Sequence, residues 1–296
     1  MNILYVNGKR NDQLLGVSFY NPTFLYGISC FEGVRAYWSS SKQSLIFLDL
    51  KEHLKRLYVS AEHMTLLPAI SIHQLLDEVL EIVRREDVRE DVYIRITFFI
   101  GGDGSWHTVE GVHYMISIRS LPSELGVRPA LALGISAYRR ISAPSMPPFV
   151  KAGANYLNSR YGVLDVRGRG FDDALFLTEG DLLSEASGST LFLFKGGEIH
   201  TPSLECDILP GITRSRLIKL CAENNMHVQE KKIHRDELHG YDGAMLAGTM
   251  IEIKPVKCIE SWNFNRSIVL CERMAKILSG FIYNRGSGME LVKFNE

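Results

Sequence analysis

Apolar residues in the first 119 positions follow two periods, one typical of strands and one typical of helices. Residues 2–6 are followed by Asn7-Gly8, a pair that indicates a tight hairpin turn. Asp49 is expected to cap a helix whose apolar residues recur every three or four positions up to Met64, and a second amphipathic helix is expected over residues 72–85. Strands are expected over residues 2–6, 33–38, 44–48, 92–100 and 114–118.

The remaining residues carry many short strand patterns that are interrupted by helical ones. Residues 120–128, which contain Pro, Ser and Gly, are the expected linker between a domain of residues 1–119 and a domain of residues 129–296. The mixture indicates an α+β fold with two domains. Further strands are expected over residues 129–138, 174–178, 190–195, 228–233, 243–246 and 251–259, and further helices over 157–167, 212–224 and 270–283.

The composition is that of an ordinary globular protein. The chain has 296 residues, 46% of them hydrophobic and 23% charged, with a formal net charge of −1. This balance gives no electrostatic reason to expect a nucleic acid or a membrane surface as a partner. No apolar run approaches the ~18 residues of a membrane span, the first residues do not read as a signal peptide, and the five scattered cysteines indicate a reducing cytoplasm.

Several familiar kinds of chemistry have no motif in this chain. The histidines and cysteines show no metal-binding spacing, so no metal site is expected. The sequence contains no GxGxxG motif that opens a helix, no GxxxxGK[ST] motif and no GxSxG motif. Residues 101–105 are rich in glycine but match none of these patterns, and they predict a tight loop.

Lys151 stands in unusual surroundings. The preceding residues 147–150 are apolar, and residues 152–154 are Ala, Gly and Ala. A lysine is usually a solvated surface residue, but a lysine held among apolar neighbours can act as a nucleophilic amine. The small residues that follow are expected to leave room for a flat ring beside the amine.

Six segments in chain order resemble the branched-chain aminotransferase family, which belongs to the class IV (fold-type IV) enzymes that use pyridoxal phosphate (PLP). Residues 26–37 resemble the family's YGxxxFEGxRAY segment, and residues 50–57 its LxxHxxRL helix. The resemblance implies the two-domain fold of D-amino acid aminotransferases, with a smaller N-terminal α/β domain and a larger C-terminal domain like a β-barrel. The other matching segments are residues 93–95, 151–159, 183–192 and 209–214 with 248–256.

The resemblance also implies which residues bind the cofactor. Lys151 would form the Schiff base with PLP and move the substrate proton, and Glu185 would face the pyridine nitrogen. Tyr156 would bond the phenolic oxygen, while Arg56 and Thr213 would bond the phosphate. A helix that begins near Gly211 offers free N–H groups for the same phosphate. The complete expected set is Lys151, Arg56, Tyr156, Glu185, Gly211, Ile212, Thr213, Gly248 and Thr249.

Substrate contacts are implied for a second set of residues. Tyr93 and the Thr249-Met250 turn would bind the substrate carboxylate, and Arg95 would receive the side-chain carboxylate of glutamate. The other residues of this second set would line the pocket for an apolar substrate side chain, and some of them would reach across from the partner subunit of a homodimer. The expected set is Tyr26, Phe31, Gly33, Arg35, Tyr93, Arg95, Thr249 and Met250.

The expected reaction moves an amino group between an apolar, branched-chain type of L-amino acid and 2-oxoglutarate. Two positions depart from the family, since Ile96 replaces a proline and Met250 replaces a frequent alanine. A specialised biosynthetic aminotransferase, a D-amino acid aminotransferase and an aminodeoxychorismate-lyase-like enzyme are alternatives on the same fold. Outside this class stand a non-catalytic small-molecule-binding protein and a hydrolase that pairs Lys151 with Ser159 or Ser187.

Overall fold

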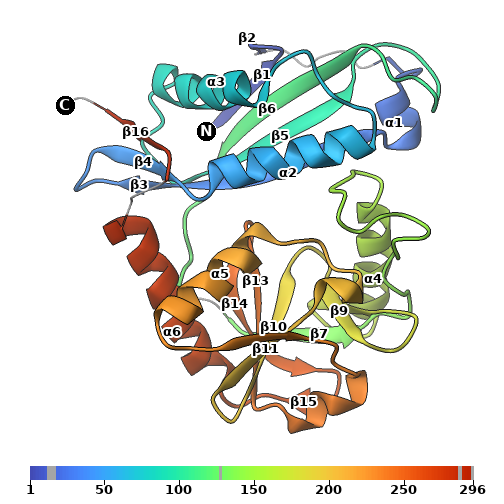
Figure 1. Ribbon diagram of the computed structural model, residues 1–296, viewed down its shortest axis with the longest axis vertical. Helices are drawn as coiled ribbons and strands as arrows, with labels where there is room; N and C mark the ends of the chain where they lie inside the picture. Colours follow the sequence, from blue (N-terminus) through green and yellow to red (C-terminus); the bar gives the residue numbers. More distant parts are fainter. Residues whose placement is uncertain (12–17, 127–128, 286–288, 295–296) are drawn as a thin grey trace. The chain divides into compact units, whose positions relative to one another are not determined.

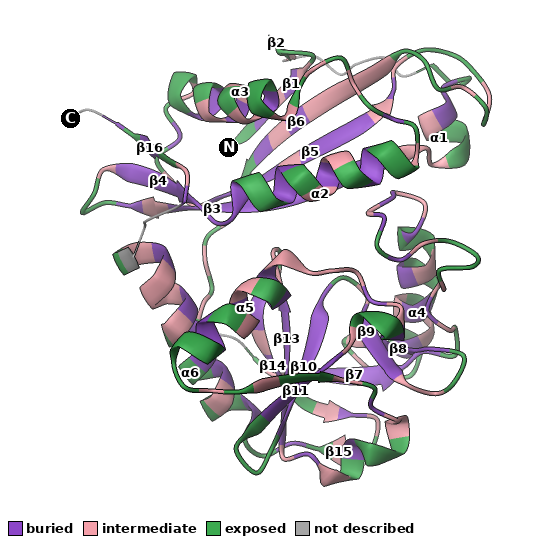
Figure 2. Ribbon diagram, viewed as in Figure 1, coloured by how far each residue is buried: buried purple, intermediate pink, exposed green. Residues whose placement is uncertain are grey.

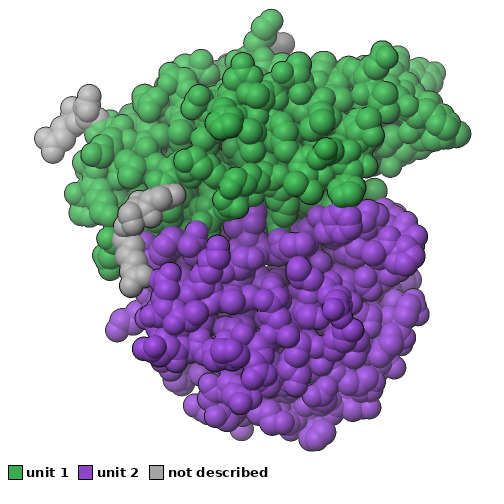
Figure 3. All heavy atoms as spheres, in the orientation of Figure 1, with its two compact units in different colours: residues 1–123, 150–154, 282–296 green, residues 124–149, 155–281 purple. Residues whose placement is uncertain are grey.

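The computed structural model describes residues 1–11, 18–126, 129–285 and 289–294 (Figure 1). The contacts divide the chain into two compact units (Figure 3). Unit 1 comprises residues 1–123, 150–154 and 282–296, and unit 2 comprises residues 124–149 and 155–281. Each unit has its own sheet and helices, which confirms the predicted α+β class.

Unit 1 is built on an antiparallel sheet whose described strands follow the order β16-β4-β3-β5-β6-β1-β2. The Asn7-Gly8 hairpin is confirmed, because both residues have positive φ angles of 45° and 75° and Val6 pairs with Lys9. The strands are β1 (Asn2–Val6), β2 (Lys9–Arg10), β3 (Ser29–Ser39), β4 (Ser44–Phe47), β5 (Val92–Ile100), β6 (Val112–Ser120) and β16 (Leu291–Lys293).

Two helices, α2 (Leu50–His63) and α3 (Ile72–Arg85), cover one face of this sheet, and a short helix, α1 (Pro22–Tyr26), precedes β3. Their apolar sides and that face of β3, β5 and β6 are buried in one core (Figure 2). Ser71 and Gln74 form a capping box at the start of α3. Asp49 precedes α2 as predicted, but its backbone is left-handed and its side chain makes no capping hydrogen bond.

Unit 2 contains a mixed sheet in the order β12-β11-β10-β13-β14-β7-β8-β9, with β15 paired to β14. A bridge between Leu182 and His234 joins the approach to β9 with the chain beyond β12, so the sheet curls as the predicted barrel-like domain requires. The strands are β7 (Leu131–Ile135), β8 (Asp173–Leu177), β9 (Leu183–Ala186), β10 (Thr190–Lys195), β11 (Glu198–Pro202), β12 (Val228–Lys231), β13 (Gly243–Gly248), β14 (Glu252–Ile259) and β15 (Trp262–Asn263).

The helices of unit 2 border the sheet. Helix α4 packs against β8 through Val166, Ala174 and Phe176. Helix α6 begins three residues earlier than predicted and is followed by a π-helical turn, Phe281–Arg285. The main core of the unit lies inside the curled sheet. The helical segments are α4 (Tyr156–Gly168), α5 (Ile212–Glu223), α6 (Ser267–Gly280), η1 (Leu204–Cys206) and η2 (Arg235–Gly240).

The contacts group the chain differently from the linear division predicted at residues 120–128. Unit 1 ends at Ser123, inside that segment, and residues 127–128 lie outside the described residues. However, Lys151, expected in the larger C-terminal domain, groups with unit 1. The cause is pairing with β3, because the backbone N–H of Phe31 bonds the Lys151 carbonyl at 3.1 Å and Cys30 forms a strand bridge with Ala152.

Candidate active site

The expected substrate residues of β3 and β5 share one face of the unit 1 sheet. Side chains alternate along a strand, and the register pairs Gly33 with Arg95 and Arg35 with Tyr93. The intervening residues, such as Val34 and Ile94, point into the core beneath α2 and α3. Phe31, Gly33, Arg35, Tyr93 and Arg95 therefore lie together on the face opposite the helices.

Gly33 makes room for the Tyr93 phenol. A Cβ atom at position 33 would lie 2.1 Å from the Tyr93 Oη and 2.6 Å from two carbons of its ring. The Tyr93 side chain therefore lies across the backbone of β3, where any larger residue would displace it. Position 33 therefore has to be glycine for the Tyr93 side chain to lie this close to the backbone of β3.

Two cationic side chains lie close to the Phe31 ring. The guanidinium carbon of Arg95 is 3.6 Å from the ring centroid, and the Lys151 Nζ is 4.9 Å from it. Arg95 also donates from Nε to the Thr97 hydroxyl at 3.3 Å. Such cation–π contacts contribute roughly 0.5–2 kcal/mol each, so Phe31 helps hold both cations on this face. Such a pair of cations is suited to bind a carboxylate.

The backbone around Lys151 is fixed by unit 1. Ser60 in α2 accepts a hydrogen bond from the Lys151 N–H at 3.1 Å. The predicted role of the small residues that follow needs correction, because Gly153 packs against β3 instead of leaving space for a ring. A Cβ atom at Gly153 would be 2.5 Å from the Ser29 hydroxyl, and one at Gly27 would be 3.5 Å from Ala154.

Arg56, the predicted phosphate ligand, is held by a buried carboxylate that the sequence analysis did not single out. Its Nε and Nη2 donate to the two Glu32 oxygens at 2.6 and 3.0 Å, and the His53 Nδ1 lies 2.7 Å from the same carboxylate. Burial raises the pKa of Glu32, but the charges and hydrogen bonds of Arg56 and His53 outweigh it and lower the pKa to about 2. The available signal was an acidic residue on the core face of an apolar strand.

Arg35 and Tyr26 have other surroundings. The Arg35 guanidinium is 1% exposed and donates to the carbonyls of Leu121 and Pro122 at 2.7 and 3.1 Å, so it anchors the chain that leaves β6. Tyr26 in α1 is exposed and packs edge-on against Trp106, with ring centroids 5.6 Å apart. The contact of either residue with a substrate stays a prediction.

In unit 2, Glu185 is buried at the end of β9. Its carboxylate lies 2.5 Å from Nη2 of Arg140, which is also buried, and it accepts the Leu209 N–H at 3.2 Å. Arg140 in turn donates to the Asp207 carbonyl at 3.3 Å. The sequence analysis did not identify Arg140, because the residues around it follow no helical or strand-like hydrophobic period. The Leu209 N–H and the bond from Arg140 to Asp207 tie Glu185 to the segment that leads into α5.

The glycine-containing segments predicted to bind the cofactor gather around the turn between β9 and β10. A Cβ atom at Gly211 would be 3.1 Å from the Thr190 hydroxyl, and one at Gly248 would be 3.3 Å from the Cβ of Ser189. Gly211 precedes α5 without a side-chain cap, so the first N–H groups of the helix are not satisfied by a capping side chain. Thr213 is buried in the first turn of this helix.

Three further predicted residues lie at the ends of elements in unit 2. Tyr156 opens α4 and is 36% exposed. Thr249 and Met250 form the turn that follows β13, and Met250 is 45% exposed. The contact of Tyr156 with the cofactor stays a prediction.

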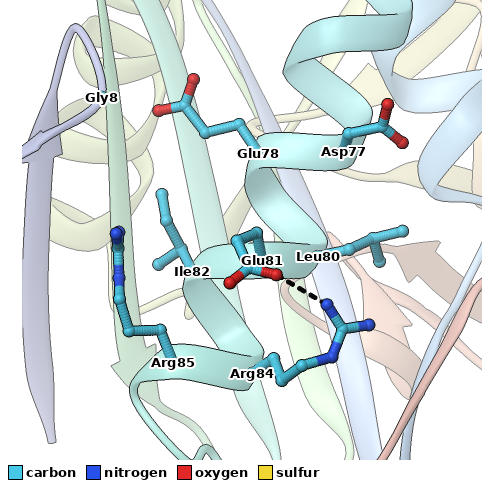
Figure 4. Close-up of a pocket in the computed structure, with 8 residues that line it drawn as sticks. All are labelled: Gly8, Asp77, Glu78, Leu80, Glu81, Ile82, Arg84 and Arg85. Atoms are coloured by element: carbon cyan, nitrogen blue, oxygen red, sulfur yellow. Dashed lines mark hydrogen bonds and ion pairs between the residues drawn. The ribbon is translucent and has the colours of Figure 1, made fainter.

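A separate groove runs along α3 beside the β1–β2 turn (Figure 4). Charged side chains line it, and Glu81 and Arg84 form an ion pair of 2.7 Å there. None of the predicted site residues belongs to its lining. Elsewhere, the described residues include no cluster of His, Cys, Asp and Glu arranged to hold a metal ion, and none of the described helices has the length and apolar character of a membrane span.

The chain is similar to known proteins over most of its length. Residues 29–259 match the family model described as "Amino-transferase class IV". The chain is 34% identical over 252 residues to a probable branched-chain-amino-acid aminotransferase of Aquifex aeolicus, covering 83% of this chain and 80% of that protein. It superposes on the branched-chain aminotransferase of Thermoproteus uzoniensis with norvaline at a TM-score of 0.89, with 28% identity and 98% of each chain covered. The T.th. branched-chain amino acid aminotransferase complexed with N-(5'-phosphopyridoxyl)-L-glutamate gives a TM-score of 0.87, with 26% identity over 99% of this chain and 98% of that one.

Proposed function

The chain belongs to the class IV aminotransferase family, and we propose that it moves an amino group between an apolar, branched-chain type of L-amino acid and 2-oxoglutarate with pyridoxal phosphate as cofactor. The observation that carries the proposal is the pair of cations at the Phe31 ring, Lys151 and Arg95. It puts the amine expected to do the chemistry near a cation suited to a substrate carboxylate.

The donor groups of this chain fit the cofactor. The uncapped first turn of α5, with Gly211, Ile212 and the Thr213 hydroxyl, would hold the phosphate together with Arg56, Gly248 and Thr249. Glu185, which Arg140 holds in place, would lie against the pyridine nitrogen, and Tyr156 would bond the ring hydroxyl. When bound, the cofactor supplies an electron sink for the bonds at the substrate Cα.

Lys151 is the residue we assign to proton transfer. Its amine would bind the cofactor covalently between reactions and would then carry the proton between the substrate Cα and the carbon C4′ of the cofactor. Arg95 and Phe31 would help to orient the amine and the substrate on the same face of the sheet. Gly153, on the same backbone segment as Lys151, packs against Ser29.

Substrate recognition follows from the same face. Tyr93 and the Thr249-Met250 turn would bind the α-carboxylate, and Arg95 would bind the side-chain carboxylate of glutamate. An apolar substrate side chain would contact Phe31, Gly33 and Tyr26, with Arg35 supporting this end of the site through the chain that follows β6. One structural relative holds norvaline, an apolar amino acid, and another holds N-(5'-phosphopyridoxyl)-L-glutamate, which supports the proposed pair of an apolar and an acidic substrate.

The test uses purified protein loaded with PLP. L-Leucine, L-isoleucine, L-valine and L-glutamate should each bleach the visible absorbance of the cofactor, and 2-oxoglutarate should restore it. Borohydride treatment followed by peptide mapping should fix a pyridoxyl group on Lys151. Bleaching by D-amino acids alone would favour the D-amino acid alternative, and a protein that remains yellow with every amino acid would refute transamination.

We also propose a homodimer in the cytoplasm. An exposed aromatic cluster around α1, formed by Phe19, Phe24, Tyr26 and Trp106, provides apolar surface of the kind found at subunit interfaces. All five cysteines are free thiols, which fits a reducing compartment. Sedimentation equilibrium at micromolar concentration should give twice the mass of the chain, and a monomer would refute the dimer.

A further inference from the structure

Glu32 is a buried charge that the proposed chemistry leaves without a role. It lies on the core face of β3 and is 0% exposed, while the residues on either side of it, Phe31 and Gly33, point to the substrate face. The hydrophobic core surrounds it on this side of the sheet. Burying a charge is costly, and ion pairs inside a protein are weak contributors to stability compared with apolar residues of similar size. A charge retained at such a place therefore calls for a functional reason.

The geometry connects Glu32 with Arg56. Two of the five N–H donors of the guanidinium bond the two Glu32 oxygens in a bidentate pair, at 2.6 and 3.0 Å. His53, one helical turn before Arg56 on the same side of α2, contributes a third contact to the carboxylate at 2.7 Å. The bidentate pair fixes both the plane of the guanidinium and the position of its long side chain.

This restraint matters for a ligand of Arg56. A free arginine side chain loses much rotational freedom when it binds an anion, and the loss is subtracted from the affinity. An arginine that is already immobilised loses less. In addition, the ionised Glu32 and the Arg56 guanidinium offset each other's charge, so the strand and helix can hold the cation at 13% side-chain exposure.

We propose that Glu32, assisted by His53, is a positioning residue that holds Arg56 in the orientation that binds the cofactor phosphate. The inference rests on the proposed function, because it takes PLP as the cofactor and Arg56 as a phosphate ligand. Glu32 itself does not touch the phosphate. It acts through the rotamer of Arg56, and its effect is confined to the phosphate part of the cofactor.

The experiment compares PLP with pyridoxal, which lacks the phosphate. Dissociation constants of both are measured by titration of the apo form of the full-length protein, for the natural chain and for Glu32→Gln. We expect Glu32→Gln to bind PLP about tenfold more weakly while its affinity for pyridoxal stays unchanged. Equal loss for both ligands, or no loss for PLP, would overturn the inference.

Two further variants keep the test decisive. Glu78→Gln is the matched control, because Glu78 on α3 bonds the Tyr114 hydroxyl at 2.6 Å in the same unit but has no bond to Arg56. It should leave the ratio of the two dissociation constants unchanged. His53→Gln keeps the pair between Glu32 and Arg56 but removes the third contact to the carboxylate, so it should lower the preference for PLP over pyridoxal relative to the natural chain, by less than about tenfold. This comparison needs only the natural chain and serves if Glu32→Gln fails to fold, and an unchanged preference would then overturn the inference.

A double substitution separates positioning from a general structural effect. In an Arg56→Lys background, which lacks the bidentate fork, Glu32→Gln should cause no further change in the preference for PLP over pyridoxal. An additive change in that background would refute a role through Arg56. If the natural chain binds no PLP at all, the proposed function fails, whereas normal PLP binding with an unaltered preference in Glu32→Gln defeats the positioning role alone.

Discussion

Replacing Gly33 with alanine should disturb the site through Tyr93 alone. The new Cβ atom would lie 2.1 Å from the Tyr93 Oη, and ordinary contact begins at 3.4 Å, so the phenol must move by about 1.3 Å. Tyr93 is 7% exposed and its strand pairs on both sides, so the backbone cannot yield easily. Overpacking of this kind costs about 1–3 kcal/mol of unfolding free energy. A displacement near 1 Å at a substrate ligand lowers kcat/KM about 100-fold.

Urea denaturation and steady-state kinetics measure the two effects. Gly33→Ala should lose stability and kcat/KM together, while its PLP content stays normal because Tyr93 is not assigned to the cofactor. Gly102→Ala is the control, since a Cβ atom there meets nothing within 4 Å. If Gly33→Ala kept kcat/KM within about threefold of the natural chain, Tyr93 would not be a substrate ligand.

Three further substitutions test other parts of the structure. Ser71→Ala removes the capping box of α3 and should cost about 1 kcal/mol in urea denaturation, and an unchanged midpoint would contradict the cap. The pKa of Glu32 is lowered to about 2, so the stabilisation that its ionised carboxylate provides is complete above the ordinary pKa of 4.5 and is lost as the pH falls toward 2. The difference in unfolding free energy between the natural chain and Glu32→Gln should therefore shrink between these two pH values. A difference independent of pH would contradict this role of Glu32. Arg140→Met leaves the buried Glu185 carboxylate without its ion pair and should cost about 3–5 kcal/mol, whereas a loss below about 1 kcal/mol would show that the pair is dispensable.

Local patterns were sufficient to predict most of the elements that position the site. The Asn7-Gly8 turn, helices α2 and α3 and the strand β5 follow from residue type and period alone. Alternation along β5 also placed Arg95 beside Thr97, on the face opposite Ile94 and Ile96. These features depend on neighbours within a few residues, which is the range over which sequence spacing carries information.

Features that depend on distant neighbours could not be predicted in the same way. Lys151 joins unit 1 because its backbone bonds the backbone of Phe31, about 120 positions earlier, and the Ser60 hydroxyl, 91 positions earlier. Gly153 was read as space for a ligand, and its contact with Ser29 became visible only in the folded chain. The roles of Glu32 and Arg140 likewise depend on ion-pair partners that are distant in the sequence, Arg56 and Glu185.

The two departures from the family pattern differ in consequence because they lie in different environments. Both lie in segments that carry predicted substrate residues, but Ile96 is 0% exposed and packs on the core face beneath the helices. Its N–H belongs to the ladder of an interior strand, where a proline would have no hydrogen to donate. Met250, by contrast, is 45% exposed in the turn after β13, next to Thr249. If Thr249 and Met250 bind the substrate as proposed, any difference in substrate choice from the relatives should be sought at Met250, since Ile96 lies in the core of the sheet.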